Sequence, residues 1–166
     1  MKYIGPDFCN ITTLLSDEEL LIQKTANEFV DKEFMPIVNE YYEKGSFPTE
    51  LIPKMGELGF FGATLPKKYG GSEISSTAYG LIMQELEKGD SGLRSVCSVQ
   101  GGLVMYPIFE YGTEEQKEKW LPQLAQGSAV GCFGLTESNH GSDPGGMTTK
   151  AVKDGDDWII NGSKMW

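Results

Sequence analysis

The hydrophobic pattern of this 166-residue sequence changes near residue 128, and this change constrains the fold more than any other feature. Before it, apolar residues recur at helical spacing in segments bounded by capping residues, glycine or proline. After it, short apolar runs are separated by two pairs typical of β-hairpin turns, Asp154-Gly155 and Asn161-Gly162. The sequence therefore predicts an α+β chain, with an all-α helical domain over 1–128 and the beginning of a β-barrel-like or β-sandwich domain over 129–166.

Five helical segments are expected in the first domain. Two of them begin with a capping box, in which a hydroxyl residue is followed three positions later by glutamate or glutamine: Ser16 with Glu19, and Thr113 with Gln116. The full set is a helix from Ser16 broken near Pro36, 49–58 ending at Gly59, about 75–88, a helix from near Ser91, and a helix from Thr113. The expected strands are 129–136 and three more within 148–166.

The composition excludes several classes of function. The chain has 14 Lys and Arg against 24 Asp and Glu, a net charge of −10, which argues against a nucleic-acid surface and against anionic membranes. It has no run of about 18 apolar residues, so no membrane span is expected. Its cysteines, Cys9, Cys97 and Cys132, are far apart and odd in number, so no disulfide framework is expected and a reducing compartment is favoured. His140 is the only histidine, and no metal site is expected.

The only arginine is Arg94, among small and apolar residues. The break at 89–92 places it in the first turn of a helix, where the helix dipole disfavours a cation. Free backbone N–H groups and a guanidinium together make a good anion site. One interpretation is therefore a bound anion; the other is a surface salt bridge to Glu87 or Asp90.

A second candidate site is the loop over 134–146, GLTESNHGSDPGG. Its glycines allow backbone N–H groups to approach a ligand, and its hydroxyls can donate to phosphate or carbonyl oxygens. The loop is neither a Walker A motif nor a G-x-G-x-x-G motif, so an ordinary glycine-rich turn is the alternative. Glu137 within it is a general base or a structural residue, and a structural role is favoured. Cys97 either faces a substrate pocket or packs in the core, and packing is favoured.

LTESNHGSDPGG, INGSKMW and YGTEEQKEKWLPQLAQG together resemble the acyl-CoA dehydrogenase family of flavoproteins. His140 departs from the family pattern, which has a small residue there. The resemblance implies a helical domain, a middle β domain and a C-terminal helical bundle, FAD as cofactor, and homotetramers. The chain would then be an N-terminal fragment without the bundle. The residues expected to line the flavin, its pyrophosphate or the pantetheine of CoA are Phe133, Leu135, Thr136, Gly141 and Ser142, with Trp166 near the isoalloxazine ring.

Within the family, EKGDSGLRSVCSVQGGLVMYPI resembles the glutaryl-CoA dehydrogenase branch. That resemblance implies that Arg94 binds the far carboxylate of a dicarboxylyl-CoA, that Ser95 and Ser98 add hydrogen bonds, and that Glu87 orients the guanidinium. It also implies α,β-dehydrogenation, with or without decarboxylation to crotonyl-CoA, and electron transfer to an electron-transfer flavoprotein.

The family's catalytic base is a glutamate of the C-terminal bundle, so no catalytic residue is assigned here and the 166 residues alone are expected to be inactive. The alternatives are a dehydrogenase for another acyl-CoA and a short non-catalytic binding module. We expect the protein in the cytoplasm of a bacterium or in the mitochondrial matrix of a eukaryote.

Overall fold

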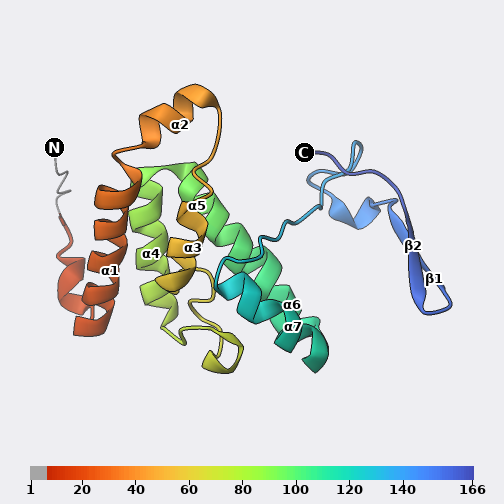
Figure 1. The fold of residues 1–166 in the computed structure, drawn as a ribbon, viewed down its shortest axis with the longest axis horizontal. Coiled ribbons are helices and arrows are strands. Elements are labelled where there is room, and N and C mark those ends of the chain that lie inside the picture. Colours follow the sequence, from red (N-terminus) through yellow and green to blue (C-terminus); the bar gives the residue numbers. More distant parts are fainter. Residues whose placement is uncertain (1–6) are drawn as a thin grey trace. The chain divides into compact units, whose positions relative to one another are not determined.

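The structure is a computed structural model that describes residues 7–166. The chain divides into two compact units, a helical unit of Met1–Gly131 and a hairpin unit of Cys132–Trp166 (Figure 1). The helical unit is built from helices and turns, and the hairpin unit contains a sheet of two antiparallel strands. This order confirms the predicted α+β architecture, a helical domain followed by the start of a sheet.

The helical unit contains seven α-helices among its described residues: α1 (Asp17–Phe29), α2 (Val38–Lys44), α3 (Leu51–Glu57), α4 (Ser76–Gly89), α5 (Ser91–Ser98), α6 (Tyr106–Tyr111) and α7 (Glu114–Ala125). Both predicted capping boxes are present. The Ser16 hydroxyl accepts from the Glu19 N–H at 3.2 Å, and the Glu19 carboxylate accepts from the Ser16 N–H at 2.9 Å. The same exchange links Thr113 and Gln116 at the start of α7. These bonds satisfy backbone donors that a helix start leaves unpaired.

Proline and glycine end the helices where the sequence predicts. α1 passes into a π-helical turn over Val30–Phe34, and α2 begins only after Pro36, which cannot continue the preceding helix. After α3, Gly59 adopts a φ of 74°, a left-handed conformation that favours glycine. Gly127 closes α7 in the same way, with a φ of 71°.

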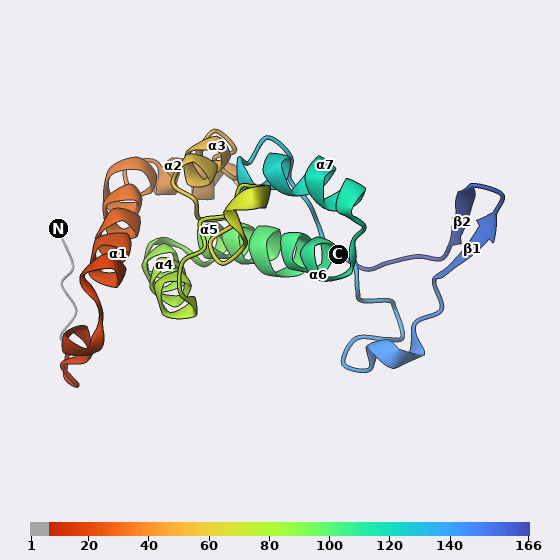
Figure 2. The same cartoon turned by 90° about the horizontal axis from the view of Figure 1, so that it is seen from below.

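The core of the helical unit is formed by residues of α1, α3, α4, α5 and α7, and α4 packs beside both α1 and α5 (Figures 1 and 2). Phe29 of α1 meets Phe60 edge-on, with 5.7 Å between the ring centroids. Leu86 of α4, and Leu93 and Cys97 of α5, are fully buried against this cluster. The packing fixes the junction between α4 and α5, which carries the first candidate site.

α5 continues through a π-helical segment, Val99–Met105, directly into α6, and the three appear as one continuous coil in Figure 2. The sequence predicted a helix from near Ser91 and gave no sign of this π-helical segment. Gly101 within it lies so close to the backbone of Phe61 that an added Cβ would be 2.7 Å from the Phe61 carbonyl oxygen. A side chain at this position would therefore force the two segments apart.

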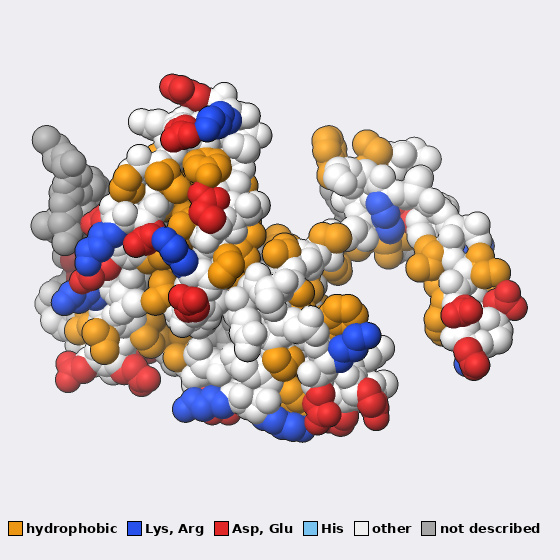
Figure 3. All heavy atoms as spheres, viewed as in Figure 1, with side chains coloured by type: hydrophobic (Ala, Val, Ile, Leu, Met, Phe, Trp, Pro, Cys, Tyr) orange, Lys and Arg blue, Asp and Glu red, His pale blue; other side chains and the backbone are white. Residues whose placement is uncertain are grey.

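The hairpin unit contains β1 (Lys150–Asp154) and β2 (Asp157–Asn161), paired antiparallel with Lys150 opposite Asn161. Gly155 in the connecting turn has a φ of 61°, so the predicted turn at Asp154-Gly155 is confirmed. Both strands are exposed along their whole length, and Figure 3 shows hydrophobic side chains over the hairpin unit.

Two expected strands are wrong for the residues that the structure describes. Residues 129–136 form no strand, and the segment after Asn161-Gly162 forms no third strand. A strand is defined by a ladder of paired backbone groups, and these two segments share one such bond, from the Met165 N–H to the Thr136 carbonyl at 2.9 Å. The segments do approach each other, but one bond does not make a ladder.

Candidate functional site

The junction between α4 and α5 places Arg94 beside Glu87. Asp90 caps α5, because its carboxylate accepts from the N–H groups of Gly92 and Leu93 at 2.7 and 3.1 Å. Asp90 is therefore engaged with the backbone. Arg94 instead donates from Nε to the Glu87 carboxylate at 2.7 Å, with the Arg94 side chain 33% exposed.

The other end of the guanidinium is held by a hydroxyl. Arg94 Nη1 donates to Ser98 Oγ at 2.9 Å, one helical turn further along α5. Ser98 in turn donates its proton to the Ser95 carbonyl oxygen at 3.2 Å. No described residue within 7–166 forms a hydrogen bond with Arg94 Nη2, so one edge of the guanidinium can receive an anion.

This cluster joins three of the four residues expected at the site of a far carboxylate, namely Arg94, Ser98 and Glu87, the residue expected to orient the guanidinium. The Arg94 guanidinium, and then the Ser91 hydroxyl at 2.7 Å, lower the pKa of Glu87 below its usual range. Glu87 is therefore ionised and fixes the guanidinium. Ser95 lies on the same helix, half-buried, and contributes its carbonyl to Ser98.

Cys97 faces the core, as the packing interpretation predicts. It is fully buried and donates a weak hydrogen bond to the Phe60 carbonyl oxygen at 3.3 Å. Burial raises the pKa of its thiol to about 12. A thiol in this environment stays protonated and is not a nucleophile.

In the hairpin unit, the candidate loop begins with a tight turn between Glu137 and His140. These two residues exchange backbone hydrogen bonds at 3.1 and 3.0 Å. The His140 ring then lies over Gly146, where an added Cβ would meet ring atoms at 2.2 Å. His140, which departs from the family pattern, therefore packs within the loop against a glycine that leaves room for it.

The Glu137 carboxylate is buried and holds the loop together. It accepts from the N–H groups of Thr148 and Thr149 at 2.7 and 3.0 Å, and from Lys164 Nζ at 3.0 Å. These donors, the Thr148 N–H first, lower the pKa of Glu137 well below its usual range. A carboxylate so strongly stabilised in its charged form is a poor general base, which supports the structural role favoured from the sequence.

The residues expected to meet a flavin lie around this framework. The bond from Met165 to Thr136 brings Trp166 to the same segment as Leu135 and Thr136. Phe133 and Trp166 are exposed, and Leu135 and Thr136 are partly so. Gly141 and Ser142 are exposed in the loop itself. Among residues 7–166, no hydrogen-bond partner is found for the hydroxyls of Thr136 and Ser142, so both remain available to a ligand.

Sequence reasoning missed Gln100, which is buried in the π-helical segment with 2% of its surface exposed. Its Nε2 donates to the carbonyl oxygens of Leu124 and Ala129 at 2.9 and 2.8 Å. Its Oε1 accepts from the Gly131 N–H at 3.0 Å. The only sequence signal is a polar residue in an otherwise apolar and glycine-rich run, VQGGLV.

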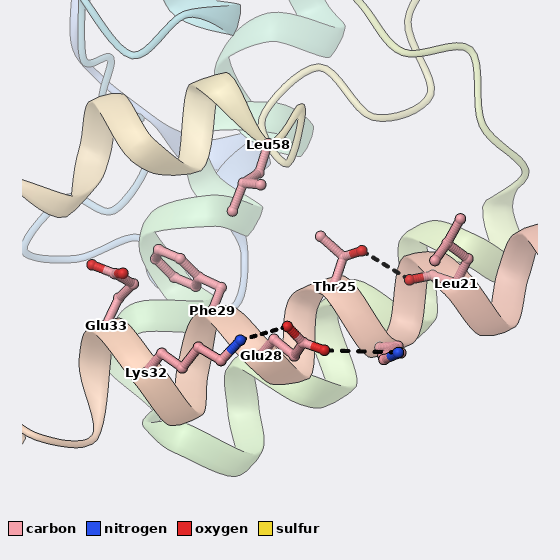
Figure 4. Close-up of a pocket in the computed structure, with 8 residues that line it drawn as sticks. Leu21, Thr25, Glu28, Phe29, Lys32, Glu33 and Leu58 are labelled. Atoms are coloured by element: carbon pink, nitrogen blue, oxygen red, sulfur yellow. Dashed lines mark hydrogen bonds and ion pairs between the residues drawn. The ribbon is translucent and has the colours of Figure 1, made fainter.

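The helical unit also has surface hollows that contain none of the expected site residues. One, of about 390 Å³, lies between α1 and Leu58 (Figure 4). Three of its charged groups pair with one another, Glu28 with Lys32 at 2.7 Å and with Lys24 at 3.9 Å, and Glu33 pairs with Lys54 outside the hollow. Another is an apolar groove of about 500 Å³ formed by α6, α7 and residues 129–131.

No helix among residues 7–166 has the length and apolar character needed to cross a bilayer. Over the same residues, no group of three or more His, Cys, Asp or Glu side chains is arranged to hold a metal ion.

Comparison with known proteins identifies the family. Residues 16–128 match the model for the N-terminal domain of acyl-CoA dehydrogenases, and residues 132–166 match the model for the middle domain. Because these matches cover most of the sequence, the chain belongs to the acyl-CoA dehydrogenase family. Its helical unit corresponds to the family's N-terminal domain, and its hairpin unit to part of the middle domain.

Several relatives resemble the chain closely. It is 42% identical to the protein named "Probable acyl-CoA dehydrogenase YngJ" of Bacillus subtilis, over 92% of this chain and 40% of that protein. It is 34% identical to the mitochondrial short-chain specific acyl-CoA dehydrogenase of Bos taurus, over 92% of this chain and 37% of that protein. A glutaryl-CoA dehydrogenase from Mycobacterium smegmatis, solved in complex with FADH2, is 48% identical with a TM-score of 0.93, over 96% of this chain and 41% of that one. The chain thus spans about 40% of the length of these relatives.

Proposed function

We propose that this chain is part of an FAD-dependent acyl-CoA dehydrogenase that removes hydrogen from the α and β carbons of a dicarboxylyl-CoA of the glutaryl type. The observation that carries the proposal is the arrangement at Arg94. Glu87 and Ser98 hold the guanidinium at Nε and Nη1, and Nη2 has no partner among residues 7–166. A fixed guanidinium with an open edge suits a carboxylate, which binds arginine with charge-assisted hydrogen bonds.

The surface salt bridge considered from the sequence is also present, because Arg94 does pair with Glu87. That pair alone does not account for Ser98, whose hydroxyl accepts from the guanidinium and so fixes its orientation. Holding a long side chain in one geometry costs conformational entropy, and an exposed ion pair contributes little stabilising free energy to offset this cost. The additional hydrogen bond from Arg94 to Ser98 therefore favours the interpretation that the guanidinium is positioned to bind a ligand.

The residues of the hairpin unit fit FAD as its cofactor. Phe133, Leu135 and Trp166 offer exposed aromatic and aliphatic surface for a planar ring system. Thr136 and Ser142 offer hydroxyls, and an added Cβ at Gly141 would meet no atom within 4 Å, so its backbone is open to a close approach. Ser142 could serve either the flavin pyrophosphate or the pantetheine of CoA. FAD, when bound, would accept the two electrons removed from the substrate.

The role of this chain's own residues is then binding and orientation. Arg94 would anchor the far carboxylate, so that the acyl carbons lie at a fixed distance from it. Ser98 donates its proton to the Ser95 carbonyl, so in this geometry it supports Arg94 and would contact the ligand directly only after its hydroxyl rotates. Glu137, fully engaged with Thr148, Thr149 and Lys164, would keep the loop in shape.

The proposal extends to partners and location. Electrons would pass on to an electron-transfer flavoprotein, and the complete enzyme would be a homotetramer. Three free cysteines, two of them exposed, support a reducing compartment, namely the cytoplasm of a bacterium or the mitochondrial matrix of a eukaryote. A second candidate function is dehydrogenation of a straight short-chain acyl-CoA, because the chain is also similar to a short-chain specific acyl-CoA dehydrogenase.

The test is anaerobic reduction of the flavin in the full-length protein encoded by the gene. Glutaryl-CoA and butyryl-CoA are compared, because their acyl chains are both short and only the former has a far carboxylate. We expect kcat/KM for glutaryl-CoA to exceed that for butyryl-CoA by at least about tenfold, a difference of about 1.4 kcal/mol. An equal or higher value for butyryl-CoA would favour the short-chain candidate. A flavin-free protein that reacts with neither would favour a non-catalytic binding module.

A further inference from the structure

The side-chain amide of Gln100 joins three backbone groups at the end of the helical unit. Both of its N–H donors are used, one on the carbonyl of Leu124 and one on that of Ala129. Its oxygen accepts from the N–H of Gly131. The Leu124 carbonyl also accepts from the Gly127 N–H at 3.2 Å, whereas no other residue among 7–166 bonds the Ala129 carbonyl or the Gly131 N–H. The buried amide therefore fixes these last two backbone groups, which have no second partner among the described residues.

Gln100 also belongs to the coil that carries Arg94. It follows Ser98 by two residues, in the π-helical segment that continues α5. π-Helical turns are rare and are often found at functional sites, because they turn a side chain out of the regular helical register. Gln100 is therefore fixed both to the helix of the carboxylate site and to the backbone of residues 129 and 131.

Residues 129–131, whose backbone Gln100 holds, lead directly into residues 132–136, which we call the flavin-binding segment. Gly131 is the last residue of the helical unit, and Cys132, Phe133 and Leu135 follow it in sequence. The position of Gly131 is further restricted by Val104, because an added Cβ at Gly131 would lie 2.4 Å from the Val104 side chain. The chain thus leaves the helical unit from a defined point.

We propose that Gln100 is a positioning residue, which holds residues 129–131, from which the flavin-binding segment 132–136 continues in sequence, at a fixed place relative to the helix that carries Arg94. This inference rests on the proposed function, because it assumes that residues after Gly131 contact FAD and that Arg94 binds the substrate. Without the hydrogen bonds from Gln100, residues 129–131 would adopt several positions. Part of the free energy of FAD binding would then be used to order them.

The experiment uses the full-length protein with three variants. Q100M fills a similar volume but forms none of the three hydrogen bonds. Q100E can still accept from Gly131, but its ionised carboxylate would face the carbonyl oxygens of Leu124 and Ala129, which raises its pKa and favours the protonated form. Q126M is the matched control, because Gln126 lies in the same region with an exposed side chain. FAD dissociation constants are measured on apoprotein, at a temperature where circular dichroism shows each variant folded.

We expect Q100M to weaken FAD binding by at least about tenfold and Q126M to change it by less than about twofold. We expect Q100E to bind FAD more tightly at about pH 6 than at about pH 8, because acid protonates the carboxyl and restores a donor. A fold-stabilising residue alone would lower the melting temperature without this pH dependence in FAD affinity.

Three results would overturn the proposal. The first is a folded Q100M that binds FAD as tightly as the wild type. The second is a Q100E whose FAD affinity does not change with pH. The third is loss of all soluble protein in both variants at either pH, which would assign Gln100 to folding alone. If the wild-type protein itself bound no FAD, the proposed function would fail as well, so the two failures are distinguishable.

Discussion

Replacing Arg94 by methionine tests the carboxylate site, because it removes the charge and keeps most of the aliphatic stem. Truncating one partner of a desolvated, hydrogen-bonded charge pair costs about 2–5 kcal/mol. The Arg94 side chain is 33% exposed, so water screens part of the interaction and the lower half of that range applies. We therefore expect a loss of about 2–3 kcal/mol of transition-state binding, or roughly 30- to 150-fold in kcat/KM for glutaryl-CoA.

The assay measures kcat/KM of the full-length R94M enzyme for glutaryl-CoA and butyryl-CoA. Butyryl-CoA is the internal control, because its acyl chain has no far carboxylate, and its kcat/KM should change by less than about threefold. R94M also removes the cation that pairs with the Glu87 carboxylate, and so leaves that negative charge beside the substrate's own carboxylate. The double variant E87Q/R94M should therefore recover part of the lost activity.

Two results would refute this reasoning. If glutaryl-CoA turnover survived R94M within about twofold, Arg94 would not bind the far carboxylate. If both substrates lost activity equally, the variant would have damaged the fold or the flavin site, and the selective role of Arg94 would be wrong.

Two further predictions concern the titrating groups. The pKa of Glu137 is lowered, first by the Thr148 N–H, so its contribution to stability is present above the ordinary carboxyl pKa and is lost as pH falls below it. E137Q should therefore weaken the pH dependence of unfolding between about pH 5 and pH 2, followed by circular dichroism; an acid-unfolding curve parallel to that of the wild type would contradict this. Burial raises the pKa of Cys97 to about 12, so a thiol reagent at neutral pH should label exposed Cys9 in the native protein and Cys97 only after denaturation. Labelling of Cys97 in the native protein, detected by mass spectrometry of its peptide, would show that it is accessible.

Local signals in the sequence predicted the helices well. The capping boxes at Ser16 and Thr113, and the hairpin turn at Asp154-Gly155, depend on residues within a few positions of one another. Such interactions form in the same way whatever surrounds them. This is why the order of elements, helices first and a hairpin after, was predictable.

Features that depend on distant partners were not predictable in the same way. The run 129–136 is apolar enough for a strand, but a strand needs a neighbour along its whole length, and the described residues supply one bond from Met165. The hydrogen-bond partners of Gln100 are 24 to 31 positions away, so nothing near it in the sequence shows that it bonds these backbone groups.

The candidate site was predicted in part. The sequence placed Arg94 at a helix start with Glu87 and Asp90 as alternative partners, and the structure selects Glu87 because Asp90 caps the helix. The resemblance to a family identified the loop residues, and the structure adds the role of Glu137 in holding them. The direction of the Ser98 proton, toward the Ser95 carbonyl, could not be read from sequence because it depends on side-chain geometry.

The central claim is that Arg94 binds the far carboxylate of the substrate, and a crystal structure of the full-length protein with FAD and glutaryl-CoA tests it most directly. We predict that the terminal carboxylate lies within hydrogen-bonding distance of Arg94 Nη2, at about 2.7–2.9 Å, while Nε stays on Glu87. A glutaryl chain whose carboxylate lies away from Arg94, with the guanidinium bonded only to Glu87 and Ser98, would contradict the claim.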